Sequence, residues 1–131
     1  GNPHTIGEAF QITSDESLSW NQIYETIADA LGVKLHPYHI SSDFLAEIGE
    51  KYDFEGSLTG DKSVTVVFDN SKLKKAVPEF NPTVSFSQGV RIALDNILAH
   101  KELQIKDAEF NSWCDNVISA LENAKSALKN Q

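Results

Sequence analysis

Residues 8–40 read EAFQITSDESLSWNQIYETIADALGVKLHPYHI, and this stretch decides the fold that the sequence predicts. Residues 8–13 have the pattern of a short strand. The segment Ser14-Asp15-Glu16-Ser17 supplies side chains that can cap a helix. Apolar residues then recur every three or four positions up to Gly32, which predicts a helix ended by that glycine. They are Trp20, Ile23, Ile27 and Leu31.

Residues 33–40 are extended again, and Pro37 places them at a sheet edge, because proline donates no ladder hydrogen bond. A strand, a helix and a strand within about 30 residues predict two parallel strands joined by a right-handed crossover. The expected fold class is therefore α/β. It consists of a small βαβ layer of short parallel strands packed with several helices and ends in a long amphipathic helix. No Rossmann domain is expected in this chain.

The rest of the chain continues this alternation of elements. Residues 41–49 predict a capped helix, residues 53–62 an irregular loop, and residues 64–68 a β-branched extended run. Asp69 and Asn70 can cap a short helix over residues 71–76, which Pro78 stops.

Two further helices are predicted from the C-terminal part of the sequence. Ser85 and Gln88 form a capping-box pattern ahead of an apolar helical face that extends to Leu98. From Asp107 onward, apolar residues again recur at spacings of three and four and predict a long amphipathic helix. They are Phe110, Trp113, Cys114, Val117, Ile118, Leu121 and Leu128.

Length and composition predict one domain over residues 1–131, whose last part, residues 101–131, is a helical extension. The net charge of −8 argues against a nucleic-acid partner.

A single cysteine, Cys114, suits a reducing compartment. Neither a signal peptide nor a membrane span is recognisable, so a cytoplasmic location is expected. The abrupt start at Gly1-Asn2-Pro3-His4 suits a segment of a longer protein.

Several kinds of catalytic or cofactor site are absent from the sequence. No G-x-G-x-x-G turn is present to approach a dinucleotide pyrophosphate, and no tyrosine is followed four residues later by lysine. His36 and His39 would point to opposite faces of a strand, which disfavours a shared metal. The acidic residues between Asp43 and Glu55 are best read as a solvated face. No catalytic, cofactor-binding or metal-ligating residue is therefore assigned.

Four short motifs occur in a suggestive order: residues 8–16, residues 20–24, Phe68-Asp69-Asn70-Ser71-Lys72 and Phe86-Ser87-Gln88-Gly89. In this order, over about residues 7–100, the chain resembles the C-terminal part of extended short-chain dehydrogenase/reductases, the NAD-dependent epimerase/dehydratase family. The resemblance implies a substrate-binding lobe for a sugar or nucleotide-sugar. That lobe is inactive until a separate N-terminal Rossmann domain supplies NAD or NADP and the catalytic tyrosine and lysine.

The resemblance also directs attention to particular residues. Gly60-Asp61 stands where many relatives carry Arg-x-Gly-Asp, but Leu58 occupies the arginine position, which weakens the case for a diphosphate substrate. The candidate substrate-binding residues are Thr13, Ser14, Gly60, Asp61, Lys62 and Arg91.

Two other functions stay open from the sequence. Some relatives on this scaffold bind other molecules without catalysis, so the chain can be read as a non-catalytic binding module. The helix after Asp107 can also be read as a dimerisation element that forms a homodimer.

Overall fold

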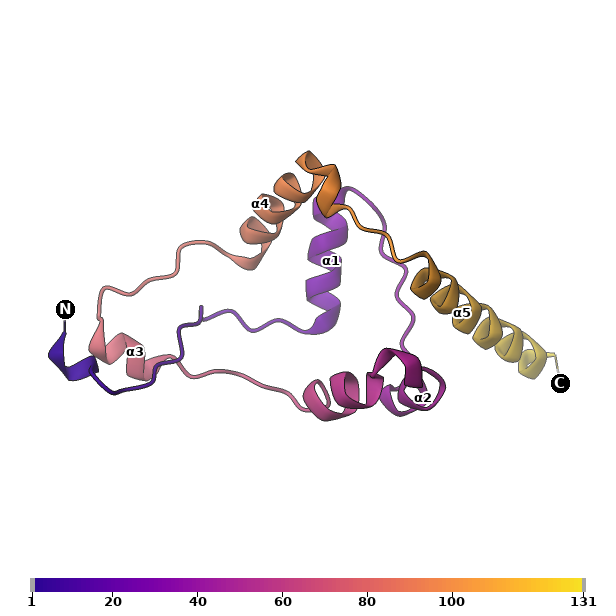
Figure 1. Ribbon diagram of the computed structural model, residues 1–131, viewed down its shortest axis with the longest axis horizontal. Helices are drawn as coiled ribbons and strands as arrows, with labels where there is room; N and C mark the ends of the chain where they lie inside the picture. Colours follow the sequence, from indigo (N-terminus) through magenta and orange to yellow (C-terminus); the bar gives the residue numbers. More distant parts are fainter. Residues whose placement is uncertain (1, 131) are drawn as a thin grey trace. The chain divides into compact units, whose positions relative to one another are not determined.

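The computed structural model describes residues 2–130, which form five α-helices (Figure 1). These are α1 (Trp20–Leu31), α2 (Ser42–Ile48), α3 (Ser71–Ala76), α4 (Phe86–Ala99) and α5 (Ala108–Lys129). The 3-10 turns are Pro3–Thr5, Glu50–Tyr52 and Lys101–Leu103, and Glu55–Asp61 is a π-helix. The stretches between these elements are extended or irregular.

The α/β fold expected from the sequence is wrong, because no β-strand occurs within residues 2–130. Residues 8–13, 33–40 and 64–68 are not helical, but no ladder hydrogen bonds join them. Two carbonyls of the first segment accept hydrogen bonds from side chains instead. Lys72 Nζ donates to the Ala9 carbonyl at 3.0 Å and Asn70 Nδ2 to the Thr13 carbonyl at 2.9 Å.

Helix α1 confirms the strongest helical pattern of the sequence. Its N-cap is Ser19, whereas the sequence had suggested residues 14–17. Ser19 Oγ accepts from the Gln22 backbone N–H at 3.3 Å, and Gln22 Oε1 accepts from the Ser19 backbone N–H at 2.8 Å. Gly32 ends the helix with φ +68°, a left-handed conformation that favours glycine.

Residues 42–61 form a local helical module, where the sequence predicted one helix and an irregular loop. The helix is confirmed as α2, capped by Ser41, but the loop prediction is wrong because Glu55–Asp61 is a π-helix. Helix α2 packs against this π-helix. Gly49, at the end of α2, is buried where the chain turns between the two.

Helices α3 and α4 begin at the predicted caps, and α5 begins at Asp107, whose capping role was not predicted. Asp69 Oδ1 accepts from the Ser71 backbone N–H at 2.8 Å at the start of α3. Ser85 and Gln88 form the expected reciprocal bonds before α4, and Asp107 Oδ1 accepts from the Phe110 backbone N–H in α5. Side chains thus satisfy N–H groups that a helix start leaves without an internal partner.

The chain divides into two compact units, Gly1–Leu94 and Asp95–Gln131, and each is described by itself. Little of the apolar surface is buried: Ala28 and Leu73 are the buried hydrophobic residues among those described. Asn70 is the buried polar side chain. Many large apolar side chains in the extended segments are exposed, including Ile12 at 72% and Val67 at 68%. Apolar contact with a further surface is therefore available to both units.

Within residues 2–130, none of the helices combines the length and hydropathy that crossing a membrane requires.

Candidate functional site

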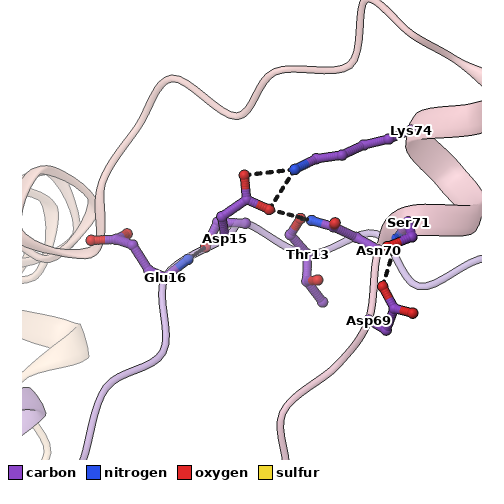
Figure 2. Close-up of polar contacts among 8 residues, drawn as sticks. Thr13, Asp15, Glu16, Asp69, Asn70, Ser71 and Lys74 are labelled. Carbon is purple, nitrogen blue, oxygen red and sulfur yellow. Dashed lines mark hydrogen bonds and ion pairs between the residues drawn. The ribbon is translucent and has the colours of Figure 1, made fainter.

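A cluster of polar side chains joins the segment before α1 to the start of α3 (Figure 2). Lys74 Nζ donates to both carboxylate oxygens of Asp15, at 2.6 and 2.7 Å. Asn70 Nδ2 donates to Asp15 Oδ1 and to the Thr13 carbonyl, both at 2.9 Å. Asn70 is only 7% exposed, so its amide makes these bonds away from bulk solvent. The cluster fixes the backbone on both sides of Ser14.

The neighbouring acidic residues tie the same segment to other parts of the first unit. Glu16 Oε2 accepts from the Phe86 backbone N–H at 2.7 Å, at the first residue of α4. An anionic carboxylate at a helix N-terminus is favourable because it faces unsatisfied N–H groups. Lys72 Nζ donates to Glu8 Oε2 at 2.6 Å and lies 5.0 Å from the centre of the Phe10 ring. Residues 8–16 are thus anchored to both α3 and α4.

A hollow of about 1020 Å³ lies next to this anchored segment. Its lining comes from residues 13–20, Ile23 and residues 61–70. Four of the six candidate residues predicted from the sequence line it, namely Thr13, Ser14, Asp61 and Lys62. The structure therefore brings together two sequence segments that are almost 50 residues apart. The lining of the hollow therefore contains hydroxyl, carboxylate and ammonium groups.

The other two candidate residues lie elsewhere in the described part of the chain. Gly60 belongs to the π-helix Glu55–Asp61 and does not line the hollow. Arg91 is an exposed residue of α4 and does not line it either. Trp20 belongs to the apolar stripe that predicted helix α1, yet it lines the hollow and is 54% exposed. The hollow thus offers an aromatic ring that the site prediction did not include.

The polar groups of the hollow are held by local bonds. Lys62 Nζ donates to Asp61 Oδ2 at 2.9 Å and to the Ser57 carbonyl at 3.2 Å, so its ammonium is held at the end of the π-helix. Thr13 Oγ1 is buried, and no hydrogen-bond partner for it is found within the part of the chain that the structure describes. A buried hydroxyl without a partner costs about 1–3 kcal/mol. A bound hydroxyl or water would relieve this cost.

Asp15, Asn70 and Lys74 are the organising residues that sequence reasoning missed. Asp15 and Asn70 were predicted as helix caps, and Lys74 only as part of the short helix over residues 71–76. The sequence does contain acidic residues before α1 and basic residues in α3. Nothing in their spacing, however, shows that positions more than 50 residues apart meet.

The Asp15 carboxyl should titrate differently once Lys74 is removed. The hydrogen bond from Lys74, then that from Asn70, lowers the pKa of Asp15 below its ordinary value. A lowered carboxyl pKa stabilises the folded state above the ordinary pKa, and that contribution is lost as the pH falls through the folded-state value. We expect Lys74→Ala to raise the pKa of Asp15 towards its ordinary value, measured by NMR titration of the carboxyl carbon.

Asp69 is the internal control for that titration. Hydrogen bonds from Ser71 lower the pKa of Asp69, and Lys74 is not among the groups that shift it. The Asp69 value should therefore stay unchanged in Lys74→Ala. An unchanged Asp15 value in the same spectra would show that the Lys74 contact does not form in solution.

No group of three or more His, Cys, Asp or Glu side chains placed to hold a metal ion occurs within the described residues. Comparison of the chain with protein-family models, with curated protein sequences and with solved structures gives no match.

Proposed function

We propose that this chain is the substrate-binding, C-terminal region of an NAD(P)-dependent sugar or nucleotide-sugar epimerase or dehydratase. It would be inactive without an N-terminal Rossmann domain. The observation that supports this most is the hollow that gathers Thr13, Ser14, Asp61 and Lys62. The four motifs that resemble the extended short-chain dehydrogenase/reductases supply the first two of these residues and the end of the hollow at Asn70.

The chemistry of the hollow suits a ligand rich in hydroxyl groups. Hydroxyl and carboxylate side chains accept and donate the hydrogen bonds that a sugar ring offers. Trp20 adds an exposed aromatic face, on which the apolar face of a sugar ring can lie. Lys62 is the cation in the lining, and its pairing with Asp61 limits the charge available to a phosphate. A sugar moiety is therefore the part of the substrate that we assign to this hollow.

Cofactor chemistry belongs to the other domain in this proposal. The chain lacks the glycine-rich turn that lets backbone approach a pyrophosphate, so its residues do not fit NAD or NADP. Its role is to select the substrate and to hold it against the cofactor domain. The exposed apolar residues of the extended segments, such as Ile12 and Val67, would be covered by that domain. A cytoplasmic, reducing location suits the single thiol of Cys114.

Sugar binding can be tested on the chain itself by NMR. The probes are UDP-glucose, dTDP-glucose, GDP-mannose and glucose 1-phosphate, with NAD⁺ as the negative control. We expect at least one sugar compound, but not NAD⁺, to shift the Trp20 indole N–H and the amides of residues 13–14 and 61–62. Lys62→Ala should weaken this binding about tenfold, the loss of one charge-assisted hydrogen bond. Lys75→Ala, an exposed lysine outside the hollow, should leave it unchanged.

Absence of shifts at millimolar concentration of all four sugar compounds would overturn the assignment of the hollow. The non-catalytic binding module would then be the better proposal, since Leu58 already replaces the arginine that relatives use for phosphate. Shifts that persist in Lys62→Ala but spread beyond the hollow would show a different binding surface.

A further inference from the structure

A second hollow of the first unit, of about 670 Å³, is lined by residues of α1 and of the extended segment that follows it. Three of its lining side chains are aromatic, namely Trp20, Tyr24 and Tyr38. They are 54%, 54% and 46% exposed, so a ligand can reach their rings. Small-molecule sites typically measure about 300–1,000 Å³, and this hollow has a suitable size. We call it the aromatic hollow.

The three rings come from two different elements. Tyr24 follows Trp20 by four positions, so both rings project from the same face of α1. Their centroids are 6.3 Å apart and their planes are tilted by 33°. Tyr38 adds a ring from the extended segment between α1 and α2. A cation interacts favourably with a ring when it lies within about 6 Å of the ring centroid, and this spacing lets one ion reach both rings of α1.

The charges around the aromatic hollow favour a cation that comes from outside the chain. No lysine, arginine, aspartate or glutamate is among the described residues that line it. Elsewhere in the first unit, Lys72 lies 5.0 Å from the centre of the Phe10 ring and Lys51 lies 5.7 Å from that of Tyr52. The rings of the aromatic hollow have no such cation within residues 2–130. The net charge of −8 also attracts cations to the chain.

The lining further restricts the kind of cation. A primary ammonium carries three N–H donors, and each donor that leaves water needs an acceptor. A carboxylate would be the strongest acceptor, but none lines the aromatic hollow. A trimethylammonium group has no N–H donor, and its methyl groups can lie directly against aromatic faces. An anion would find no lysine or arginine in the lining.

From this combination we propose that the aromatic hollow binds the quaternary ammonium group of a small molecule, held by Trp20, Tyr24 and Tyr38. The side-chain amide of Asn21, also in the lining, is available to a hydroxyl group of the same ligand. The site does not depend on sugar binding, although Trp20 lines both hollows. Tyr24 and Tyr38 line only the aromatic hollow of these two, so their signals distinguish the two sites.

The experiment titrates the full chain with choline by proton NMR at about pH 8, where imidazole side chains are uncharged. We expect the ring protons of Tyr24 and Tyr38 to shift. The choline methyl signal should move upfield, because protons over an aromatic face are shielded. The comparison ligand is the neutral tert-butyl analogue, in which carbon replaces the quaternary nitrogen. It has the same shape without the charge and should bind at least about fivefold more weakly.

Two outcomes with the unchanged chain would overturn the proposal. Absence of shifts at Tyr24 and Tyr38 at millimolar choline would show that the rings do not form a cation site. Equal binding of choline and of its neutral analogue would show an apolar surface that does not select charge. Neither outcome bears on residues 61–62, which report on sugar binding in the first hollow.

Variants of Tyr38 test the contribution of a ring. Tyr38→Leu removes the aromatic face but keeps an apolar side chain, and should weaken choline binding about fivefold, equivalent to about 1 kcal/mol. Tyr38→Phe keeps the ring and should bind within about twofold of the unchanged chain. Circular dichroism at 222 nm checks that both variants keep their helices. Equal losses in the two variants would assign the contact to the hydroxyl group and overturn the ring interaction.

A final comparison identifies the source of the quaternary ammonium group. An amide of trimethyllysine carries the same group as choline, but on a peptide side chain. Choline has in addition a hydroxyl that can bond to Asn21, so it should bind at least as tightly. A clear preference for the trimethyllysine amide would overturn the assignment to a small molecule and favour a modified protein as the ligand.

Discussion

Replacing Asn70 by aspartate, Asn70→Asp, is expected to lower the free energy of unfolding of the first unit by about 3 kcal/mol at pH 7. The change preserves the shape of the side chain but replaces its NH₂ donor with a carboxylate oxygen. That oxygen would face the Thr13 carbonyl and Asp15 Oδ1, both of which now accept from Asn70 at 2.9 Å. Two attractive contacts thus become repulsive at a position that is 7% exposed.

The destabilisation should depend on pH in a definite direction. The neighbouring oxygens disfavour the ionised form, so the pKa of the introduced carboxyl is raised in the folded state. The penalty is then complete above that raised value and disappears below about pH 4, the ordinary carboxyl range, because both states are protonated there. Amide hydrogen exchange at Lys74 and Val77, whose N–H groups donate to the Asn70 and Leu73 carbonyls, measures it locally.

Asn81→Asp is the matched control, because Asn81 is exposed and the same charge is added. It should change exchange in α3 little. Equal effects of the two variants would mean that net charge, not the Asn70 contacts, controls the stability of α3.

Gly49→Ala is expected to destabilise the α2 module by about 2 kcal/mol, the typical cost of inserting an extra carbon into a packed site. A Cβ atom at Gly49 would lie 2.5 Å from Phe54 Cδ2 and 2.7 Å from the Leu45 carbonyl oxygen. The phenyl ring can rotate, but the carbonyl belongs to α2 and can move only if the helix end moves. The contact between α2 and the π-helix should therefore loosen.

Gly60→Ala provides the comparison within the same module. A Cβ atom there would meet only the Glu55 carbonyl, at 3.6 Å, which is an ordinary contact. Alanine also has the higher helix propensity, so this variant should be neutral or slightly stabilised. Urea unfolding followed by circular dichroism at 222 nm measures both variants. A Gly49→Ala chain as stable as Gly60→Ala would show that the turn after α2 is not packed as described.

The parts of the fold that could be predicted are those whose hydrogen bonds are local. The apolar stripe and Gly32 were enough to predict helix α1, and the pair Ser85 and Gln88 predicted the start of α4. A helix satisfies its backbone within one segment, so residues three and four apart suffice to recognise it. The π-helix at residues 55–61 was missed because its two glycines, Gly56 and Gly60, are typical of loops.

The extended segments could not be predicted in the same way. Residues 8–13 and 64–68 have strand-like sequences, but a strand is completed only by a neighbour elsewhere in the chain. Here the side chains of Asn70 and Lys72 donate hydrogen bonds to backbone carbonyls of the first segment. The same limit applies to the hollow. Its residues were proposed one by one from the resemblance and from loop positions. That they lie beside Asp15 and Asn70 depends on contacts between residues more than 50 positions apart in the sequence.

The exposed run Val64-Thr65-Val66-Val67-Phe68 favours aggregation of the newly synthesised chain. It is β-branched, aromatic and uncharged, the composition from which intermolecular stacking and aggregates start. Asp61 and Lys62 on one side and Asp69 on the other act as gatekeepers, because stacking identical segments would place like charges in register. In the proposed whole protein, docking of the Rossmann domain on this run and self-assembly would compete for the same five residues.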